Sequence, residues 1–256
     1  MSLASDKAQA FVAGLKASSG LDLLAGSGRQ AMSDLPVPTR KSERWKYSSL
    51  TPMLAKPVTT APVPKGWPEG EPANPIPGLH AYRIVFLNGH VVTEASDFPI
   101  AEGVVCMPLS QALAEGRIEA GDEDWSHYHT REWIGAVHAA HFQDGLFLSL
   151  DEGVVLDRPI LAHHYTLGEN VASCPRHRVQ IASNAHAEVV LWSSASESSS
   201  GMVNAVFEAK VGSGARLGLD KVQHEQGAVY HLAHEHVVQE KDSTFRIHTV
   251  TVQGHW

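Results

Sequence analysis

Evenly spaced β-strand patterns fill the second half of this 256-residue chain. Each run alternates apolar and polar residues with the period of two that a half-buried strand requires. Two successive strands make a repeat of about 28 residues, and a fixed period in this range is typical of a solenoid. A parallel β-helix fits the pattern, and so does a β-sandwich or jelly roll. The five predicted strands begin at Ala187, Val203, Ala215, Val229 and Thr244.

The solenoid interpretation assigns an interior and an open end. The last strand, 245–252, is followed by only four residues and by no capping pattern, although solenoids need a terminal cap. We therefore expect a truncated solenoid with Phe245, Ile247, Val250 and Val252 bare on one side. Either the end is covered by self-association, or the last strand frays. The side chains predicted to point inside are Ala187, Val189, Leu191, Phe207, Leu217, Leu219 and Ile247.

The first 79 residues predict short helices followed by a connector. Ala8, Phe11, Val12 and Leu15 form one apolar helical stripe, and Gly20 and residues 26–28 are expected to break it. A second short helix is predicted over 29–35. Residues 36–77 hold ten of the fourteen prolines, which predicts an extended connector without core helix or sheet. Within it, Trp45 and Tyr47 stand among charges and are expected to anchor the connector.

The middle of the chain mixes both periods. Residues 82–87 predict a strand, and Asn88-Gly89 turns it into a hairpin with residues 91–93. Helices are expected at about 110–115 and 125–142, and a strand at 146–150. The predicted domains are therefore an N-terminal helical segment with its connector (1–79), a mixed α/β cap (80–145) and a partial β-helix core (146–256).

Charge and composition exclude several classes of protein. The net charge is −8, and residues 61–256 alone carry −12, which does not suit a nucleic-acid groove. The basic run Arg40, Lys41, Arg44 and Lys46 is typical of a solvated face, or of contact with an acidic partner. No apolar run approaches the ~20 residues that span a bilayer. The sequence predicts no nucleic-acid partner and no membrane partner.

The N-terminus and the cysteines indicate a cytoplasmic protein. The first residues have no uninterrupted apolar stretch of the secretory type. Cys106 and Cys174 lie far apart and outside any CxxC pair, so we expect two reduced thiols. Cys174 precedes a proline in a predicted loop, and an inert thiol is the expected state.

Histidines suggest one metal motif. His234-x-His236-x3-Glu240 resembles the first metal motif of cupin barrels, and residues two apart on a strand share a face. Ala228 and Ile247 stand where the cupin motif has glycines. The alternative is a row of polar residues on an exposed sheet face, and we expect the three side chains not to converge on one metal.

The remaining motifs predict no catalytic, cofactor-binding or metal-binding residue. His138 and His141 share a helix face but lack a carboxylate at the expected spacing. His163 and His164 point to opposite faces of one strand. The serine-rich stretch 193–201 is expected to be a loop, and the chain has no GxSxG, P-loop or dinucleotide fingerprint.

Four stretches together resemble the SufD family of the SUF iron–sulfur cluster assembly system. SufB shares the β-helical core, but the N-terminal half is more similar to SufD. The resemblance implies a right-handed parallel β-helix preceded by a helical domain. The stretches are 43–47 (ERWKY), 84–89 (IVFLNG), 139–148 (AAHFQDGLFL) with Pro159-Ile160, and 176–223 with Asn204 and Gln223.

The function implied by this resemblance is a non-catalytic scaffold subunit that pairs with SufB and binds the ATPase SufC. The parent complex handles the iron–sulfur cluster, and this chain has no cofactor of its own. Family members continue beyond the position of Trp256 and carry their cluster-related histidine there, so no functional residue is carried over. His138 and His141 also depart from the family pattern. The alternatives are a cupin-like metal-dependent enzyme using His234, His236 and Glu240, and a β-solenoid binding module without metal.

Overall fold

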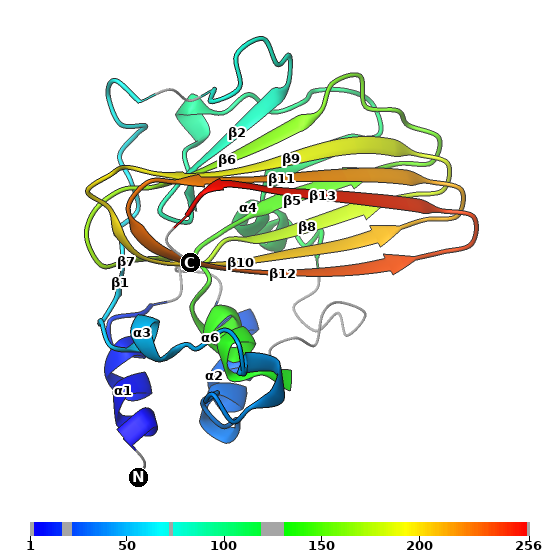
Figure 1. The fold of residues 1–256 in the computed structure, drawn as a ribbon. Helices are drawn as coiled ribbons and strands as arrows, with labels where there is room; N and C mark the ends of the chain where they lie inside the picture. The colour runs from blue at the N-terminus through cyan, green and yellow to red at the C-terminus, as the bar shows by residue number, and fades with distance from the viewer. Residues whose placement is uncertain (1–2, 17–21, 72–73, 119–130, 255–256) are drawn as a thin grey trace.

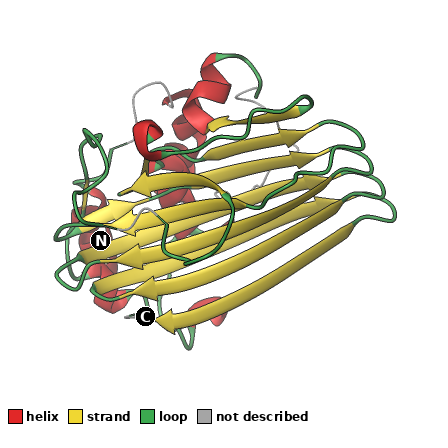
Figure 2. Ribbon diagram, turned by 90° about the horizontal axis from the view of Figure 1, so that it is seen from above, coloured by secondary structure: helices red, strands yellow, loops and turns green. Residues whose placement is uncertain are grey.

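Two facing sheets build a parallel β-solenoid, and a group of helices lies against one side of it (Figure 1). The computed structural model describes residues 3–16, 22–71, 74–118 and 131–254. Seen from above, the long strands run side by side and their connecting loops stack at the two ends (Figure 2). The successive coils are β5 (Leu146–Leu150) with β6 (Ile160–Thr166), β7 (Val171–Ser173) and β8 (Arg176–Ile181) with β9 (His186–Ala195), β10 (Ser200–Val211) with β11 (Arg216–Glu225), and β12 (Ala228–Gln239) with β13 (Thr244–Gln253).

The strand register confirms the predicted solenoid. Ser200 pairs with Ala228 and Arg216 with Thr244, both in parallel strands, so the last coils repeat as the sequence predicts. All contacts between coils are parallel among the described residues. Sandwiches and jelly rolls are antiparallel architectures, and this pairing excludes them. The serine-rich stretch is only partly a loop, because β9 extends to Ala195 and β10 begins at Ser200.

One left-handed residue recurs at the same turn of each coil. Gly153, Asn184, Gly214 and Asp242 have φ of 72°, 59°, 69° and 58°, a region that glycine, asparagine and aspartate tolerate best. The turns also bond to one another, since the amide of Asn184 donates to Ser213 O at 3.0 Å. The small-residue punctuation of the sequence therefore sets the stacking of the coils.

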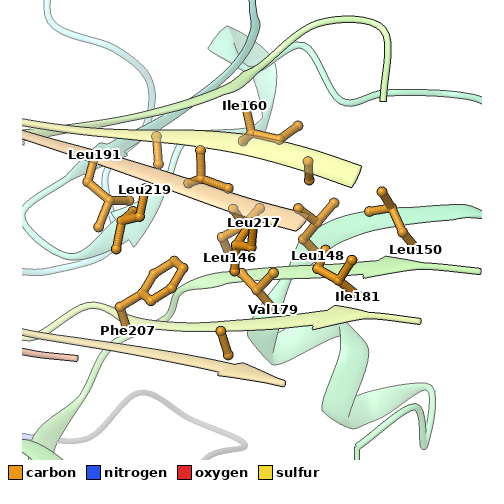
Figure 3. Close-up of a cluster of buried hydrophobic side chains, with 14 of the residues drawn as sticks. Leu146, Leu148, Leu150, Ile160, Val179, Ile181, Leu191, Phe207, Leu217 and Leu219 are labelled. Carbon is orange, nitrogen blue, oxygen red and sulfur yellow. The ribbon is translucent and has the colours of Figure 1, made fainter. Parts of the chain in front are cut away.

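Inward side chains form a continuous apolar core along one half of the solenoid (Figure 3). The residues predicted to lie inside are buried, with one exception. Ile247 is 41 % exposed, because β13 is the last strand of its sheet among the described residues and no further coil in that part covers it. Phe245 on the same strand is partly buried against the core.

The helices pack beside β10. The expectation that residues 26–28 break a helix is wrong. Helix α1 (Leu3–Val12) is followed by α2 (Asp22–Asp34), which continues through Gly26 and Gly28 instead of ending there. A Cβ on Gly28 would approach the Ala139 carbonyl carbon to 2.6 Å in α6 (Trp133–His141). Gly28 therefore permits close packing of α2 on α6, which outweighs its low helix propensity. The predicted helix 125–142 begins outside the described residues.

The proline-rich connector contributes more to the core than predicted. It forms η1 (Glu43–Trp45), the short helix α3 (Thr51–Leu54) and β1 (Thr59–Thr60), which pairs parallel with β7. Met53 and Leu54 are buried in the core beneath the helices. The expectation of a connector without core helix or sheet is therefore wrong.

Only one of the two connector aromatics acts as an anchor. Trp45 is partly buried, and its Nε1 donates to Glu132 Oε2 at 3.3 Å. Arg44 pairs with the same carboxylate at 2.6 Å. Tyr47 is 89 % exposed, so the expectation that it anchors the connector is wrong.

A mixed α/β segment covers the first coil. The predicted hairpin forms β2 (Tyr82–Leu87) and β3 (His90–Val91), and β2 pairs parallel with β6. Next come η2 (Thr93–Ala95), β4 (Val104–Pro108), which pairs antiparallel with β5, and α4 (Leu109–Ala114). Both sheets therefore extend past the first coil.

Candidate functional site

The interior of the solenoid changes from apolar to polar along its strands. On β11, Leu217 and Leu219 pack in the apolar core, whereas Lys221 and Gln223 line a cavity at the other end. The cavity has a volume of about 210 Å³ and lies between the two sheets near the last coils. Histidines from β6, β8 and β12 complete its polar wall: His164, His177 and His231.

Two of these histidines contact each other directly. The Nε2 atoms of His164 and His177 are 3.1 Å apart, and the amide of Leu146 donates to His177 Nδ1 at 3.0 Å. His164 also stacks on Phe86, with ring centroids 4.3 Å apart. Burial lowers the pKa of His177 to about 3 and that of His164 well below its ordinary value. Both rings are therefore neutral at physiological pH.

A carboxylate orients the third histidine. Glu225 is buried, and its two oxygens lie 3.0 and 3.1 Å from His231 Nδ1. The Gln223 amide donates to the same carboxylate at 2.8 Å. Lys221 and Glu235 form an ion pair from opposite sheets across this end of the interior. Each charged group thus has a partner: Lys221 and Glu235 pair with each other, and hydrogen bonds satisfy Glu225, as burial requires.

A second buried charge cluster lies on the outer face of β8 and β10, on the side of the helices. Glu208 is fully buried and accepts from the guanidinium groups of Arg176 (2.8 and 3.0 Å) and Arg178 (3.0 Å). Burial opposes ionisation of Glu208, yet the two arginines hold its pKa below the usual range. Asn204 donates to Ile134 O in α6 at 3.0 Å, so polar contacts join the helices to the solenoid.

The residues of the cupin-like motif do not form one site. His234 and His236 lie on β12, opposite Val206 and Glu208 of β10. Glu240 follows the end of β12, and its carboxylate accepts from the amide and hydroxyl of Ser213, at 3.1 and 2.8 Å. Parallel strand pairing also excludes the cupin barrel, which is antiparallel. Among the described residues, no group of three or more potential ligands is arranged to hold a metal.

The other sequence candidates take separate structural positions. His138 Nε2 contacts Pro175 O at 3.1 Å, and His141 Nδ1 contacts Val137 O at 2.9 Å, so the two rings do not share a ligand. Burial, helped by the Arg176 charge, lowers the pKa of His138 to about 3. His163 contacts Ser194 Oγ on the outer face of its sheet, whereas His164 lies inside, as predicted.

Cys174 is buried, Cys106 is partly buried, and both thiols are protonated. Burial raises the pKa of Cys106 and of Cys174 to about 12. A thiol of this kind is a poor nucleophile, because the thiolate is the reactive form.

The last coil presents an uncovered strand. β13 pairs only with β11 within its sheet among the described residues. Three of its apolar side chains are substantially exposed: Ile247 (41 %), Val250 (52 %) and Val252 (64 %). Arg246 on β13 nevertheless forms an ion pair with Glu188 on β9 at 2.6 Å, so the outer face of β13 contacts β9. Such an edge is a template for pairing with another chain.

Sequence reasoning missed the paired charges of the interior. The period of two that places Leu217 and Leu219 inside also places Lys221 and Glu225 inside, so the signal was present. The Arg176–Glu208–Arg178 cluster gives no such signal, because its burial depends on the helices that lie far away in the sequence.

The fold and this interior define a parallel β-solenoid protein with a polar inner end and a helical cover. Residues 164–256 match the family model described as SUF system FeS cluster assembly, SufBD core domain. The match supports the SufB/SufD family and a role in SUF iron–sulfur cluster assembly, and it does not distinguish SufD from SufB. No curated protein matches the chain. No helix of the described part of the chain is long and apolar enough to cross a membrane.

Proposed function

We propose that this chain is a SufD-like scaffold component of iron–sulfur cluster assembly that acts with SufB-like and SufC-like subunits. The observation that carries the proposal is the overlap of the family match with the coil stack. The family match begins at residue 164, within β6, and extends over every later coil of the parallel solenoid. The family match therefore lies within the coil stack and leaves out β5 and the first part of β6.

The N-terminal half supports SufD over SufB in this proposal. Three of the four stretches that resemble SufD lie before the residues of the family match. Residues 43–47 hold the Trp45 anchor, 84–89 form the β2 hairpin, and 139–148 connect α6 with β5. These segments position the helices on the solenoid, which is the part that the family match does not reach.

A scaffold role without catalysis agrees with the chemistry of the site. Lys221 and Glu235 form an ion pair, the Glu225 carboxylate accepts from Gln223 and His231, and burial raises the pKa of both thiols. The sequence has no P-loop, so nucleotide hydrolysis belongs to the SufC-like partner in this scheme. We place the assembly in the cytoplasm, and the iron–sulfur cluster is the cargo of the complex rather than a cofactor of this chain.

Complementation tests the assignment to SufD. The gene that encodes this chain is introduced into one bacterial strain that lacks SufD and another that lacks SufB. We expect restored activity of iron–sulfur enzymes in the first strain only. Rescue of the SufB-deficient strain alone would assign the chain to SufB, and rescue of neither at normal expression would contradict the proposal.

Co-purification tests the partners. A tagged copy of the chain is expressed with SufB-like and SufC-like subunits, and the complex is analysed by size-exclusion chromatography. We expect both subunits to be retained and ATP hydrolysis to require the SufC-like subunit. The control variant Ile100→Lys should retain both subunits, because Ile100 is 97 % exposed and lies outside the coils. ATP hydrolysis by the chain alone would contradict the scaffold role.

A further inference from the structure

Hydrogen bonds fix the tautomers of the two touching histidines. A backbone amide is always a donor, so His177 Nδ1 accepts from Leu146 N and carries no proton. Neutral His177 therefore carries its proton on Nε2, which lies 3.1 Å from His164 Nε2. His164 Nε2 must accept that proton. The proton of neutral His164 is consequently on Nδ1.

This chain of donors ends at an unsatisfied group. His164 Nδ1 is buried and has no hydrogen-bond partner among the described residues, and the His164 ring lines the interior cavity. A buried donor without an acceptor is destabilising, because it has lost its hydrogen bonds to water. An occupant that accepts a hydrogen bond would remove this cost.

An acceptor faces the same cavity. A carboxylate accepts, so His231 donates its Nδ1 proton to Glu225. When the ring is neutral, a proton on Nδ1 leaves Nε2 with a free lone pair. Among the described residues this Nε2 has no hydrogen-bond partner, and His231 lines the same cavity. The cavity of about 210 Å³ exceeds the ~30 Å³ that one water occupies in the liquid.

We propose that the polar end of the solenoid interior is a binding site for a small protic molecule that accepts from His164 Nδ1 and donates to His231 Nε2. Water is the resident occupant. The site is not built for a metal ion, although three histidines line it. His177 Nε2 carries a proton and His164 Nε2 receives it, so neither atom offers a free lone pair to a cation. This inference does not rest on the proposed function.

Nitrogen NMR of the histidine side chains tests the tautomers. In the ¹⁵N-labelled 256-residue chain we expect His177 as the Nε2–H form and His164 as the less common Nδ1–H form. An Nε2–H form of His164 would overturn the proposal. His177→Gln retains an amide donor and should keep His164 in the Nδ1–H form, whereas His177→Phe removes the donor and should release it to the Nε2–H form.

Two further measurements test the occupant. A water cross-peak at His164 Hδ1 is expected, and His231→Phe should weaken it by removing the acceptor. His80→Phe is the matched control because His80 is exposed and lies outside the cavity. A dry cavity with no water contact in the unaltered chain would overturn the proposal. Equimolar binding of cobalt(II) that is lost in His231→Gln would instead identify a metal site and overturn it as well.

Discussion

The two halves of the solenoid interior use opposite physical solutions. The half in Figure 3 contains Leu217, Leu219, Val179 and Ile181, which are buried without polar partners. In the other half the same strands present polar and charged side chains, such as Lys221 on β11. The apolar half stabilises the fold by removing surface from water, at about 25 cal/mol per Å². The polar half gains little from burial, because each group must be paired to offset its desolvation.

This difference indicates where the fold and the function reside. A stack of coils is already supported by its apolar half and by backbone pairing between strands. Positions that depart from the simplest burial pattern in a folded protein tend to be functional. The polar half therefore holds the specific chemistry of the interior, and the apolar half provides the rigid frame around it.

The largest expected effect comes from truncating the apolar half. Leu219→Ala should lower the free energy of unfolding by about 2–5 kcal/mol, because the side chain is fully buried and leaves a cavity. Ile247 pairs with Leu219 in the next coil but is 41 % exposed, so Ile247→Ala is the matched control and should cost less than half as much. Urea unfolding measures both. Equal losses would show that the last coil is as well packed as the inner ones.

Acidification should act through buried histidines, including those of the polar half. The pKa of His177 and of His138 is lowered to about 3, that of His164 is also lowered, and all three rings are buried. Below pH 6.5 these three histidines bind protons in the unfolded chain but stay neutral in the folded chain. Stability is thus complete above pH 6.5 and falls toward pH 3, by up to about 1.4 kcal/mol per pH unit for each histidine.

Urea unfolding between pH 7.5 and 5.0 measures this loss. His177→Gln should reduce the slope, since one titrating group is removed. The exposed control His80→Gln should leave it unchanged. An unaltered slope in His177→Gln would mean that the ring is protonated in the folded state as well.

A smaller effect is expected from the ion pair across the polar half. Lys221→Met leaves Glu235 without its cationic partner and should cost about 1–3 kcal/mol. The double variant Lys221→Met, Glu235→Leu removes both charges and should recover most of that loss, because apolar replacements of a buried pair are often neutral or better. A double-mutant cycle by urea unfolding gives the coupling. Additive losses would show that the pair is fully solvated.

The apolar half was predictable from sequence, and the polar half only in part. The period of two identifies Ala187, Leu217 and Phe207 as inward residues without reference to any other segment. The prediction that Ile247 is buried is wrong. The period of two places it on the inward face of β13, but the described coils include no further strand to pack over it. Burial of an end position depends on the next coil, and periodicity contains no information about that.

Contacts between distant segments explain the other errors. The continuation of α2 through Gly28 depends on α6, more than a hundred residues later. The sequence also makes no prediction of the tautomers of His164 and His177, which depend on a backbone amide of β5. Local propensity is a weak prior, and tertiary packing overrides it at such places.

The smallest effect on stability is expected at the open end, where association is affected instead. β13 is an edge strand, and Ile247 and Val250 on it are exposed. Unpaired backbone groups beside apolar side chains favour pairing with a second copy, most simply as two β13 strands related by a two-fold axis. We therefore expect the apparent mass of the chain to rise with concentration in sedimentation experiments, and residues 244–253 to gain hydrogen-exchange protection in parallel.

A charge at the edge separates this association from folding. Ile247→Lys should abolish the rise in mass, because pairing would bury the ammonium group, while the free energy of unfolding measured at low concentration changes by less than about 0.5 kcal/mol. Ile100→Lys adds the same charge at a position that is 97 % exposed and distant from β13, so it should leave the association intact. If the unaltered chain stays monomeric while β13 is as protected from exchange as β9, the edge is already covered within one chain, and the contrast between the inner and the last coil disappears.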